Sequence, residues 1–176
     1  MIRKCLAFTG FLLMCGFLYR GLQLHPQEMP SVVIGQKLPV VEVIENQTGR
    51  NVKISQWFGQ PMLIHFWASW CENCAAEMPL LMAWTAEHQV PIIGVDYKDN
   101  QADSKKWWDL WGSVFTGLLN DPKGQFAFNL GVVATPETFL IDEQGIVLYR
   151  YQGLLTPEIL ASEIEPKLKK MSDQHV

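Results

Sequence analysis

The chain has 176 residues, of which 48% are apolar and 18% are charged, and its formal net charge is −4. This composition suits one globular domain with an apolar core. The basic residues form no run long enough to follow a nucleic-acid backbone, so we expect no nucleic-acid partner. The sequence shows no short-period repeat and no low-complexity tract.

The first 24 residues differ from the rest. Arg3 and Lys4 precede an uncharged, mostly apolar run at residues 5–19, and Arg20 follows it. This is the layout of a signal sequence or a signal anchor. The run is shorter than the roughly 20 residues of an ordinary membrane-spanning helix, but it lengthens if Arg20 snorkels. Because no small-x-small cleavage site stands out, we predict an uncleaved anchor over residues 1–24.

Arg3 and Lys4 predict that the N-terminus stays on the cytoplasmic side. We therefore expect a single-pass protein whose domain faces outward; in a Gram-negative bacterium this is a protein of the bacterial inner membrane with its soluble domain in the periplasm. A lipoprotein site at Cys15 is disfavoured, because Met14 is too large for the position before a lipidated cysteine. Cys5 and Cys15 are expected to be inert apolar residues.

Residues 25–33 contain two prolines and predict a tether, followed by a domain over residues 34–172. The almost continuously apolar segment 62–68 predicts a strand that is buried on both faces. Thr156 and Pro157 predict the start of the last helix. Further strands are predicted at residues 40–44, 52–54, 91–97, 114–119, 137–141 and 146–152, and further helices at residues 71–89, interrupted by Pro79, and 103–111.

The order of these elements is two short strands, then β-α-β-α, then β-β-α. Alternation of strands and helices is typical of a buried parallel sheet, and the last two strands form a hairpin. We therefore predict an α/β protein, a three-layer α/β/α sandwich.

Cys71 and Cys74 lie where the buried strand gives way to a helix. The N-terminus of a helix carries unpaired N–H groups and the positive end of the dipole, and both favour an anion. A thiolate there has a lowered pKa and is the attacking species in thiol–disulfide exchange. Cys74 lies one turn later, close enough to form a disulfide. We predict that Cys71 is the nucleophile and that Cys74 resolves the mixed disulfide.

Other uses of the two cysteines fit less well. A structural zinc site needs four ligands, and no second Cys or His pair stands at zinc spacing. Haem attachment requires histidine after the second cysteine, where this chain has Ala75. Packing alone does not explain two cysteines at a strand–helix junction in an oxidising compartment. We therefore predict a redox dithiol and expect no metal and no cofactor.

The segment from Phe66 to Cys74, with Pro79 after it and Thr135-Pro136 downstream, resembles the active site of thioredoxin. The resemblance narrows to the membrane-tethered DsbE/CcmG thioredoxins of cytochrome c maturation. It covers roughly residues 34–170 together with the N-terminal anchor. The segments that carry it are residues 94–99, 131–142 and 145–151.

This resemblance implies a thioredoxin-like fold with an N-terminal strand extension and a central insert. Family members keep the cysteines of apocytochrome c reduced so that haem can be attached, either directly or through a partner thiol protein. Their electrons come from DsbD-like proteins of the inner membrane. We therefore expect a disulfide reductase with these partners. The alternatives are a broader periplasmic reductase, such as a copper-tolerance thioredoxin, and a metal or haem chaperone that binds through Cys71 and Cys74.

The family also implies roles for residues around Pro136. A cis peptide before Pro136 would place this loop against the cysteines, and the backbone of Thr135 would pair with an incoming peptide; the alternative is an ordinary trans turn. Glu77 and Glu137 match acidic positions of the family, where carboxylates near a dithiol disfavour the thiolate and relay protons. Glu77 as a solvated helix residue is the alternative.

His65 occupies the position at which other thioredoxins carry a buried carboxylate that accepts a proton from the second cysteine. A neutral imidazole can do the same work, but a hydrogen-bonded core histidine fits this position equally well. Asp96 and Asp99 are expected to be ordinary polar residues rather than an extension of the acidic site.

Among the tryptophans, Trp67 and Trp70 match the active-site pattern, and we expect Trp70 to shield Cys71. The group formed by Trp107, Trp108 and Trp111 is expected to pack rather than to bind a ligand.

Two positions depart from the family pattern. Glu72 replaces the usual proline, and Ala134 replaces a glycine. An acid at position 72 weakens the thiolate, so we expect it to make the pair more reducing. Ala134 is expected to alter the groove that selects partners.

Overall fold

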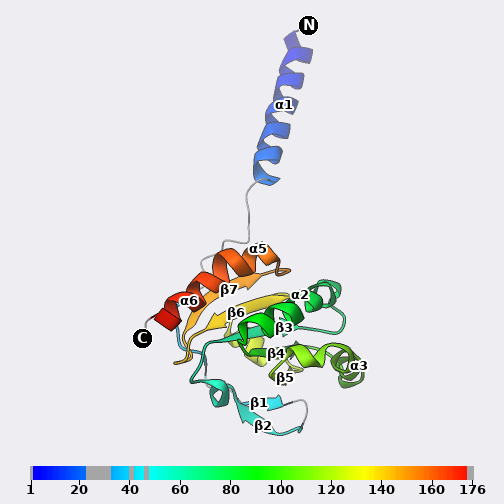
Figure 1. The fold of residues 1–176 in the computed structure, drawn as a ribbon. Helices are drawn as coiled ribbons and strands as arrows, with labels where there is room; N and C mark the ends of the chain where they lie inside the picture. Colours follow the sequence, from blue (N-terminus) through cyan, green and yellow to red (C-terminus); the bar gives the residue numbers. More distant parts are fainter. Residues whose placement is uncertain (1, 23–32, 40–41, 46–47, 174–176) are drawn as a thin grey trace. The chain divides into compact units, whose positions relative to one another are not determined.

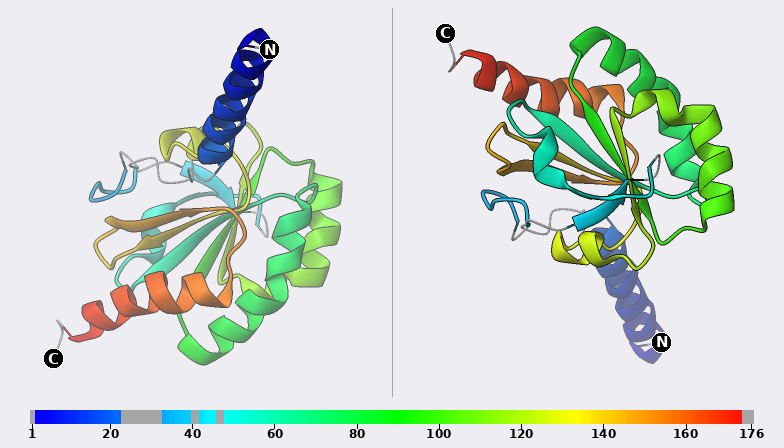
Figure 2. Two further views of the ribbon diagram at one scale, coloured as in Figure 1. Left: turned by 90° about the horizontal axis from the view of Figure 1, so that it is seen from above. Right: turned by 90° about the horizontal axis from the view of Figure 1, so that it is seen from below.

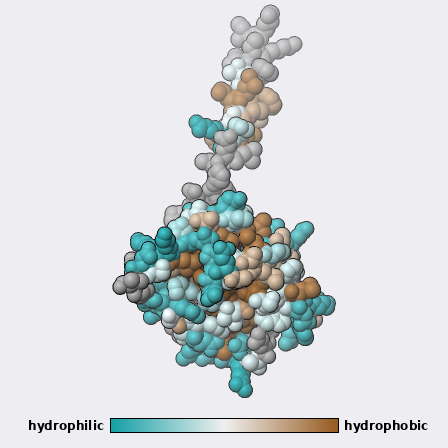
Figure 3. Space-filling view, in the orientation of Figure 1, coloured by the Kyte–Doolittle hydropathy of each residue, from teal (hydrophilic) through white to brown (hydrophobic). Residues whose placement is uncertain are grey.

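The computed structural model describes residues 2–22, 33–39, 42–45 and 48–173, and it divides into two compact units, Met1–Pro30 and Ser31–Val176. The first unit holds helix α1 (Ile2–Leu22), which exposes large apolar side chains between Phe11 and Tyr19 (Figures 1 and 3). In the described part of the chain, no helix combines the length and hydropathy needed to cross a membrane. The predicted tether lies outside the described residues except for Val33.

In the described part of the second unit, seven strands form one mixed sheet in the order β2-β1-β5-β4-β3-β6-β7 (Figure 1). Strands β3, β4 and β5 are parallel, and the other neighbours are antiparallel. The strands are β1 (Glu42–Glu45), β2 (Asn51–Lys53), β3 (Met62–Trp67), β4 (Ile92–Tyr97), β5 (Gly117–Asp121), β6 (Glu137–Ile141) and β7 (Val147–Gln152).

Helices cover both faces of this sheet, as predicted (Figures 1 and 2). We call the face under α2, α3 and the C-terminal helices the α2 face, and the face under α4 the α4 face. The helical segments of the domain are η1 (Ile54–Trp57), α2 (Glu72–His88), α3 (Gln101–Trp111), η2 (Gly112–Val114), α4 (Gln125–Asn129), α5 (Pro157–Ile159), the π-helical turn η3 (Leu160–Ile164) and α6 (Glu165–Asp173).

Strand β3 is buried along its whole length, which confirms the prediction from its apolar sequence. Successive side chains of a strand point to opposite faces. Leu63 and Trp67 accordingly pack with the α2 face, whereas Met62, Ile64 and Phe66 pack with the α4 face. His65 shares the α2 face, because it lies between Leu63 and Trp67 in this alternation.

Several element boundaries differ from those predicted. Pro79 lies inside α2 and does not interrupt it. Ile54 begins η1 rather than ending β2, and Val114 ends η2, so that β5 begins only at Gly117. Of the strand predicted at residues 40–44, positions 40 and 41 lie outside the described residues.

The short helix α4 was not predicted from the sequence. The carboxylate of Asp121 accepts hydrogen bonds from the backbone N–H groups of Gln125 and Ala127, at 2.7 and 2.9 Å, and thereby holds the first turn of α4. The predicted cap of the last helix is confirmed, because the hydroxyl of Thr156 accepts from the N–H of Ile159 and Pro157 occupies the first turn.

The tryptophan group packs as predicted. The rings of Trp67 and Trp107 stack with their centroids 3.8 Å apart, and Trp108 and Trp111 pack against the same cluster. On the face of the molecule shown in Figure 3, hydrophilic residues cover much of the domain and apolar residues form patches between them.

Close packing around Gly94 provides a test of this core. A Cβ atom at this buried position of β4 would lie 2.9 Å from the ring of Phe115. We expect Gly94→Ala to lower the free energy of unfolding by about 1–3 kcal/mol, the usual cost of overpacking a core. Urea denaturation of the full chain measures the change. The loss should shrink when Gly94→Ala is combined with Phe115→Leu, and an unchanged denaturation midpoint for Gly94→Ala would contradict the packing.

Candidate active site

Cys71 and Cys74 are joined by a disulfide at the N-terminus of α2, with their Cα atoms 5.3 Å apart. Cys71 is the N-cap residue, and its Sγ accepts a hydrogen bond of 3.1 Å from the backbone N–H of Cys74. Cys71 retains 6% of its surface, whereas Cys74 has none. The predicted placement is confirmed, and Cys71, the less buried of the two cysteines, is the one whose sulfur accepts from the helix N-terminus, where negative charge is stabilised.

The segment that leads from β3 to Cys71 is held by a residue that sequence reasoning left aside. The carboxylate of Asp99 accepts hydrogen bonds from the backbone N–H and the hydroxyl of Ser69, at 2.5 and 2.9 Å. Trp70, between this anchor and the cysteine, is 60% exposed. Asp99 thus fixes the backbone two residues before the nucleophile, while the shielding of Cys71 by Trp70 remains a prediction.

Asp96 is buried at the end of β4, where it pairs in register with Trp67 of β3. Burial raises the pKa of its carboxyl to about 7, and the nearby charge of Asp99 adds to the rise. A group that titrates near neutrality therefore lies beside the strand that leads to the cysteines. Asp96 and Asp99 were expected to be ordinary polar residues, and their sequence spacing alone does not indicate these roles.

The peptide between Thr135 and Pro136 is cis, as predicted. Pro136 precedes β6, and the first residue of β6, Glu137, pairs in antiparallel register with Phe66 near the end of β3. The cis-proline loop and the segment that leads to Cys71 therefore leave the sheet at the same edge. The carbonyl of Pro136 accepts a hydrogen bond of 2.9 Å from the N–H of Gly153.

Glu77 and His65 form a buried pair on the α2 face. His65 Nε2 lies 3.2 Å from Glu77 Oε1, and neither side chain is exposed. His65 Nδ1 lies 3.0 Å from the hydroxyl of Thr138, and the N–H of Leu155 donates to Glu77 Oε2 at 2.8 Å. The alternative that Glu77 is a solvated helix residue is therefore wrong.

His65 Nδ1 and the hydroxyl of Thr138 share a hydrogen bond, and the carboxylate of Glu77 accepts one from the backbone of Leu155. Between the two side chains, His65 Nε2 and Glu77 Oε1 approach closely without the geometry of a hydrogen bond. His65 is thus a hydrogen-bonded core histidine, one of the two interpretations left open by the sequence. Since Glu77 follows Cys74 by three residues on α2, its carboxylate lies one helical turn beyond the buried sulfur. Proton transfer from Cys74 to this pair remains a prediction.

Glu137 precedes Phe139 by two residues on β6, so both side chains lie on the α4 face of the sheet. This is the face opposite to that of Glu77 and His65. The buried carboxylate of Glu137 forms an ion pair with Arg150 of β7. Burial raises the pKa of Glu137, and the charge of Arg150 opposes that rise. The two acidic residues predicted near the dithiol therefore occupy separate environments, each with its own basic partner, instead of one shared acidic cluster.

The geometry allows one chemistry in particular. A disulfide whose less buried cysteine accepts a hydrogen bond at a helix N-terminus can be reduced and re-formed, and these are the two halves of thiol–disulfide exchange. Among the described residues, no three His, Cys, Asp or Glu side chains are grouped to hold a metal ion. The site and fold define a thioredoxin-like thiol:disulfide oxidoreductase.

Comparisons with known proteins name the family. Residues 34–150 match the AhpC/TSA family. The chain is 36% identical over 165 residues to DsbE-2 of Pasteurella multocida, covering 93% of this chain and 87% of that protein. It is 35% identical over 164 residues to the thiol:disulfide interchange protein DsbE of Pseudomonas fluorescens, covering 93% and 92%. The structure of a DsbE protein from Chlorobium tepidum matches with a TM-score of 0.65 and 28% identity, covering 78% of this chain and 96% of that one. The chain therefore belongs to the DsbE thiol:disulfide interchange proteins of the AhpC/TSA family.

The exposed first-turn residue Glu72 lies directly after Cys71. Its charge interacts with the same helix N-terminus that would stabilise a thiolate at Cys71. We expect Glu72→Gln to make the reduction potential less negative by on the order of 10–20 mV. Equilibration of the full chain with reduced and oxidised glutathione measures this potential. Glu87→Gln, at an exposed position near the other end of α2, should leave it unchanged. An unchanged or more negative potential for Glu72→Gln would show that the carboxylate does not influence the dithiol.

Asp96 predicts a pH dependence of stability. Because its pKa rises from 3.8 to about 7 on folding, the folded state holds a proton that the unfolded state has lost. This contribution to stability is complete below about pH 4 and is lost as the pH rises to 7, with a slope of at most about 1.4 kcal/mol per pH unit. Asp96→Asn, which imitates the protonated carboxyl, should lack this loss. Urea denaturation of both proteins between pH 4 and 8 measures it, and parallel stability curves would contradict the assignment.

Proposed function

We propose that this protein is a periplasm-facing, membrane-anchored reductant of disulfides in apocytochrome c, or in a partner thiol protein, during cytochrome c maturation. The observation that carries the proposal is the dithiol Cys71–Cys74 at the N-terminus of α2 in a chain of the DsbE family. Residues 94–99, 131–142 and 145–151, which resemble the cytochrome c maturation members, support the narrower role.

The proposed reaction begins with the reduced dithiol. The thiolate of Cys71 attacks one sulfur of the substrate disulfide, a mixed disulfide forms, and the other substrate sulfur leaves as a thiolate. Cys74 then loses its proton and attacks Cys71 Sγ, which releases the second substrate thiolate and forms the Cys71–Cys74 disulfide. Two electrons pass to the substrate, whose two thiolates take up protons. A DsbD-like membrane protein returns the enzyme to the dithiol form.

The deprotonation of Cys74 needs an acceptor, because this sulfur is fully buried. The carboxylate of Glu77, one turn further along α2 and in close contact with His65, supports this step. Thr135, beside the cis-proline, offers backbone groups to an extended substrate segment.

The N-terminal segment supports the proposed location. Arg3 and Lys4 precede α1, and large side chains between Phe11 and Tyr19 are apolar and exposed on this helix. We propose that residues 1–24 anchor the protein in the inner membrane with the N-terminus in the cytoplasm.

Trapping of the mixed disulfide tests the substrate. In Cys74→Ser the attack on the mixed disulfide is blocked, so adducts through Cys71 should accumulate at least about ten-fold over the unaltered protein. We expect apocytochrome c or a thiol protein of the maturation system in these adducts, identified by mass spectrometry after non-reducing electrophoresis. The double variant Cys71→Ser/Cys74→Ser should form none, and Cys15→Ser, which alters a cysteine outside the domain, should not change the yield.

Other outcomes select between the alternatives. A diverse set of unrelated adducts would contradict the cytochrome assignment and favour a broad periplasmic reductase. If the unaltered protein fails to reduce insulin, and binding of a metal or haem survives Cys74→Ser, a chaperone role is favoured instead.

A further inference from the structure

Arg150 lies behind the cis-proline loop, on the α4 face of the sheet. In the register of β6 and β7 it lies opposite Phe139, and its guanidinium is 5.5 Å from the centroid of that ring. Glu137 precedes Phe139 by two residues, so its side chain emerges on the same face. The extended side chain of Arg150 therefore runs along β6 towards the loop, with only 13% of its surface exposed.

The guanidinium binds both ends of the loop. Its Nε donates a hydrogen bond to Oε1 of Glu137, the residue directly after Pro136. Its Nη2 donates to the backbone carbonyl of Gly131, the residue that begins the loop, at 2.7 Å. A planar guanidinium can donate in two directions at once, whereas the ammonium of lysine is a single point of charge. One side chain thus connects the two ends of residues 131–137.

In the middle of the loop, the backbone N–H of Val133 donates a hydrogen bond to the carboxylate of Glu137, the same carboxylate that Arg150 holds. Val133 is 77% exposed, and Ala134 is also exposed. The ends are held by backbone hydrogen bonds, from Val132 N–H to the carbonyl of Ala127 and from Gly153 N–H to the carbonyl of Pro136. The span between these bonds is closed by the contacts of Arg150 and by the bond between the backbone of Val133 and the carboxylate that Arg150 holds. Loss of one charge-assisted hydrogen bond costs more than loss of a neutral one, so Arg150 contributes strongly to closing the loop.

We propose that Arg150 is a positioning residue that holds the cis-proline loop in the shape that receives the backbone of a peptide disulfide, and thereby sets the preference for peptide substrates over small disulfides. Arg150 acts through Gly131 and Glu137 and does not touch the substrate. The proposal rests on the pairing of this loop with substrate, which is part of the proposed function, but it does not depend on which protein the substrate is.

The test uses the full chain, reduced beforehand, in single turnover. The enzyme dithiol reduces a synthetic peptide with an internal Cys-x-x-Cys disulfide to the peptide dithiol and becomes the disulfide itself. Hydroxyethyl disulfide, which has no peptide backbone, is the comparison substrate. The peptide concentration at half-maximal rate reports binding, and the maximal rate reports the chemistry at Cys71.

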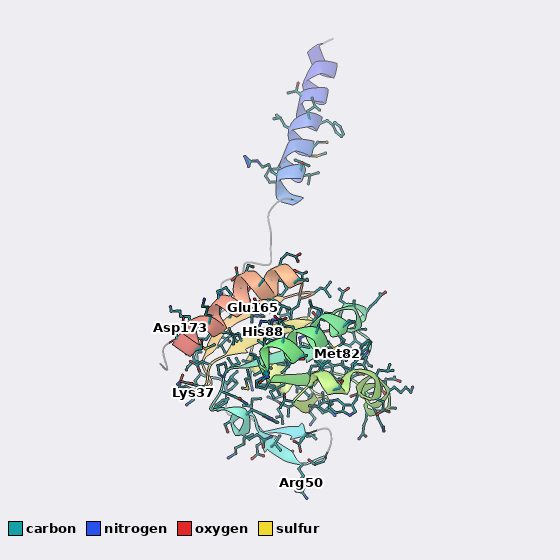
Figure 4. All side chains as sticks on the ribbon, viewed as in Figure 1. Lys37, Arg50, Met82, His88, Glu165 and Asp173 are labelled. Carbon is teal, nitrogen blue, oxygen red and sulfur yellow. A yellow bond between two sulfur atoms is a disulfide. The ribbon has the colours of Figure 1, made fainter. Side chains whose placement is uncertain are left out.

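For Arg150→Met, which keeps most of the apolar stem, we expect the half-saturating peptide concentration to rise by about five- to ten-fold. The maximal rate with peptide and the rate with hydroxyethyl disulfide should both stay within about two-fold, because the dithiol lies on the other face of the sheet. Arg50→Met is the matched control, since this exposed arginine precedes β2, away from the loop, and should behave as the unaltered protein (Figure 4).

Two further variants keep the proposal open to refutation. Arg150→Lys retains the charge but not both hydrogen bonds, so it should give an intermediate half-saturating concentration. The double variant Glu137→Gln/Arg150→Met should have a half-saturating peptide concentration close to that of Arg150→Met alone, because both changes remove the same contact. If Arg150→Met does not fold, Arg150→Lys decides: a half-saturating concentration equal to that of the unaltered protein overturns the proposal.

Two other results would also overturn it. One is a parallel loss of rate with both substrates, which would indicate a general effect on stability or on the dithiol. The other is an unaltered protein that shows no saturable preference for the peptide, which would remove the role of the loop itself. Neither result bears on the adducts trapped by Cys74→Ser, so the identity of the substrate is tested separately.

Discussion

The buried contact between the side chains of His65 and Glu77 joins the central strand to the helix that carries the cysteines. Through Thr138 and Leu155 the same contact also reaches β6 and the segment before the last helix. All these polar groups are buried, and leaving a buried polar group without its partner costs about 1–3 kcal/mol. The position of α2 on the sheet, and with it the position of Cys71 at the sheet edge, is thus constrained by a polar contact as well as by apolar packing.

The contacts that hold the dithiol and those that hold the cis-proline loop lie on opposite faces of the sheet. On the α2 face, side chains of β3 contact the helix that holds Cys71 and Cys74, and the buried acid–histidine pair lies beyond the second sulfur. On the α4 face, Glu137 and Arg150 hold the loop that ends in Pro136. The antiparallel register of β3 and β6 brings the two loops to one edge. The dithiol and its neighbouring loop therefore rest on separate sets of contacts, which allows each to change with little effect on the other.

Three of the buried acids of the described domain, Glu77, Glu137 and Asp96, have different environments. Glu77 accepts a hydrogen bond from the backbone of Leu155 and lies against His65, Glu137 faces the guanidinium of Arg150, and Asp96 is buried near a second carboxylate. Burial disfavours a charged carboxylate, whereas hydrogen-bond donors and cations favour it. Burial moves the pKa of Asp96 to about 7, so the packing of β4 places a carboxyl that takes up a proton near neutrality beside the segment that leads to the cysteines.

The sequence by itself determined the elements whose signals are local. The apolar run of β3, the two cysteines at a helix start, the cap at Thr156 and the cis-proline motif each depend on neighbours within a few residues, and all were predicted. The tertiary structure decided which polar side chains meet. Asp99 lies 30 positions from Ser69, and Glu77 lies 78 positions from Leu155. Arg150 meets Glu137 only because β6 and β7 pair in one register. Such contacts depend on how strands and helices pack in space, and that packing is a property of the whole chain which no short stretch of sequence contains.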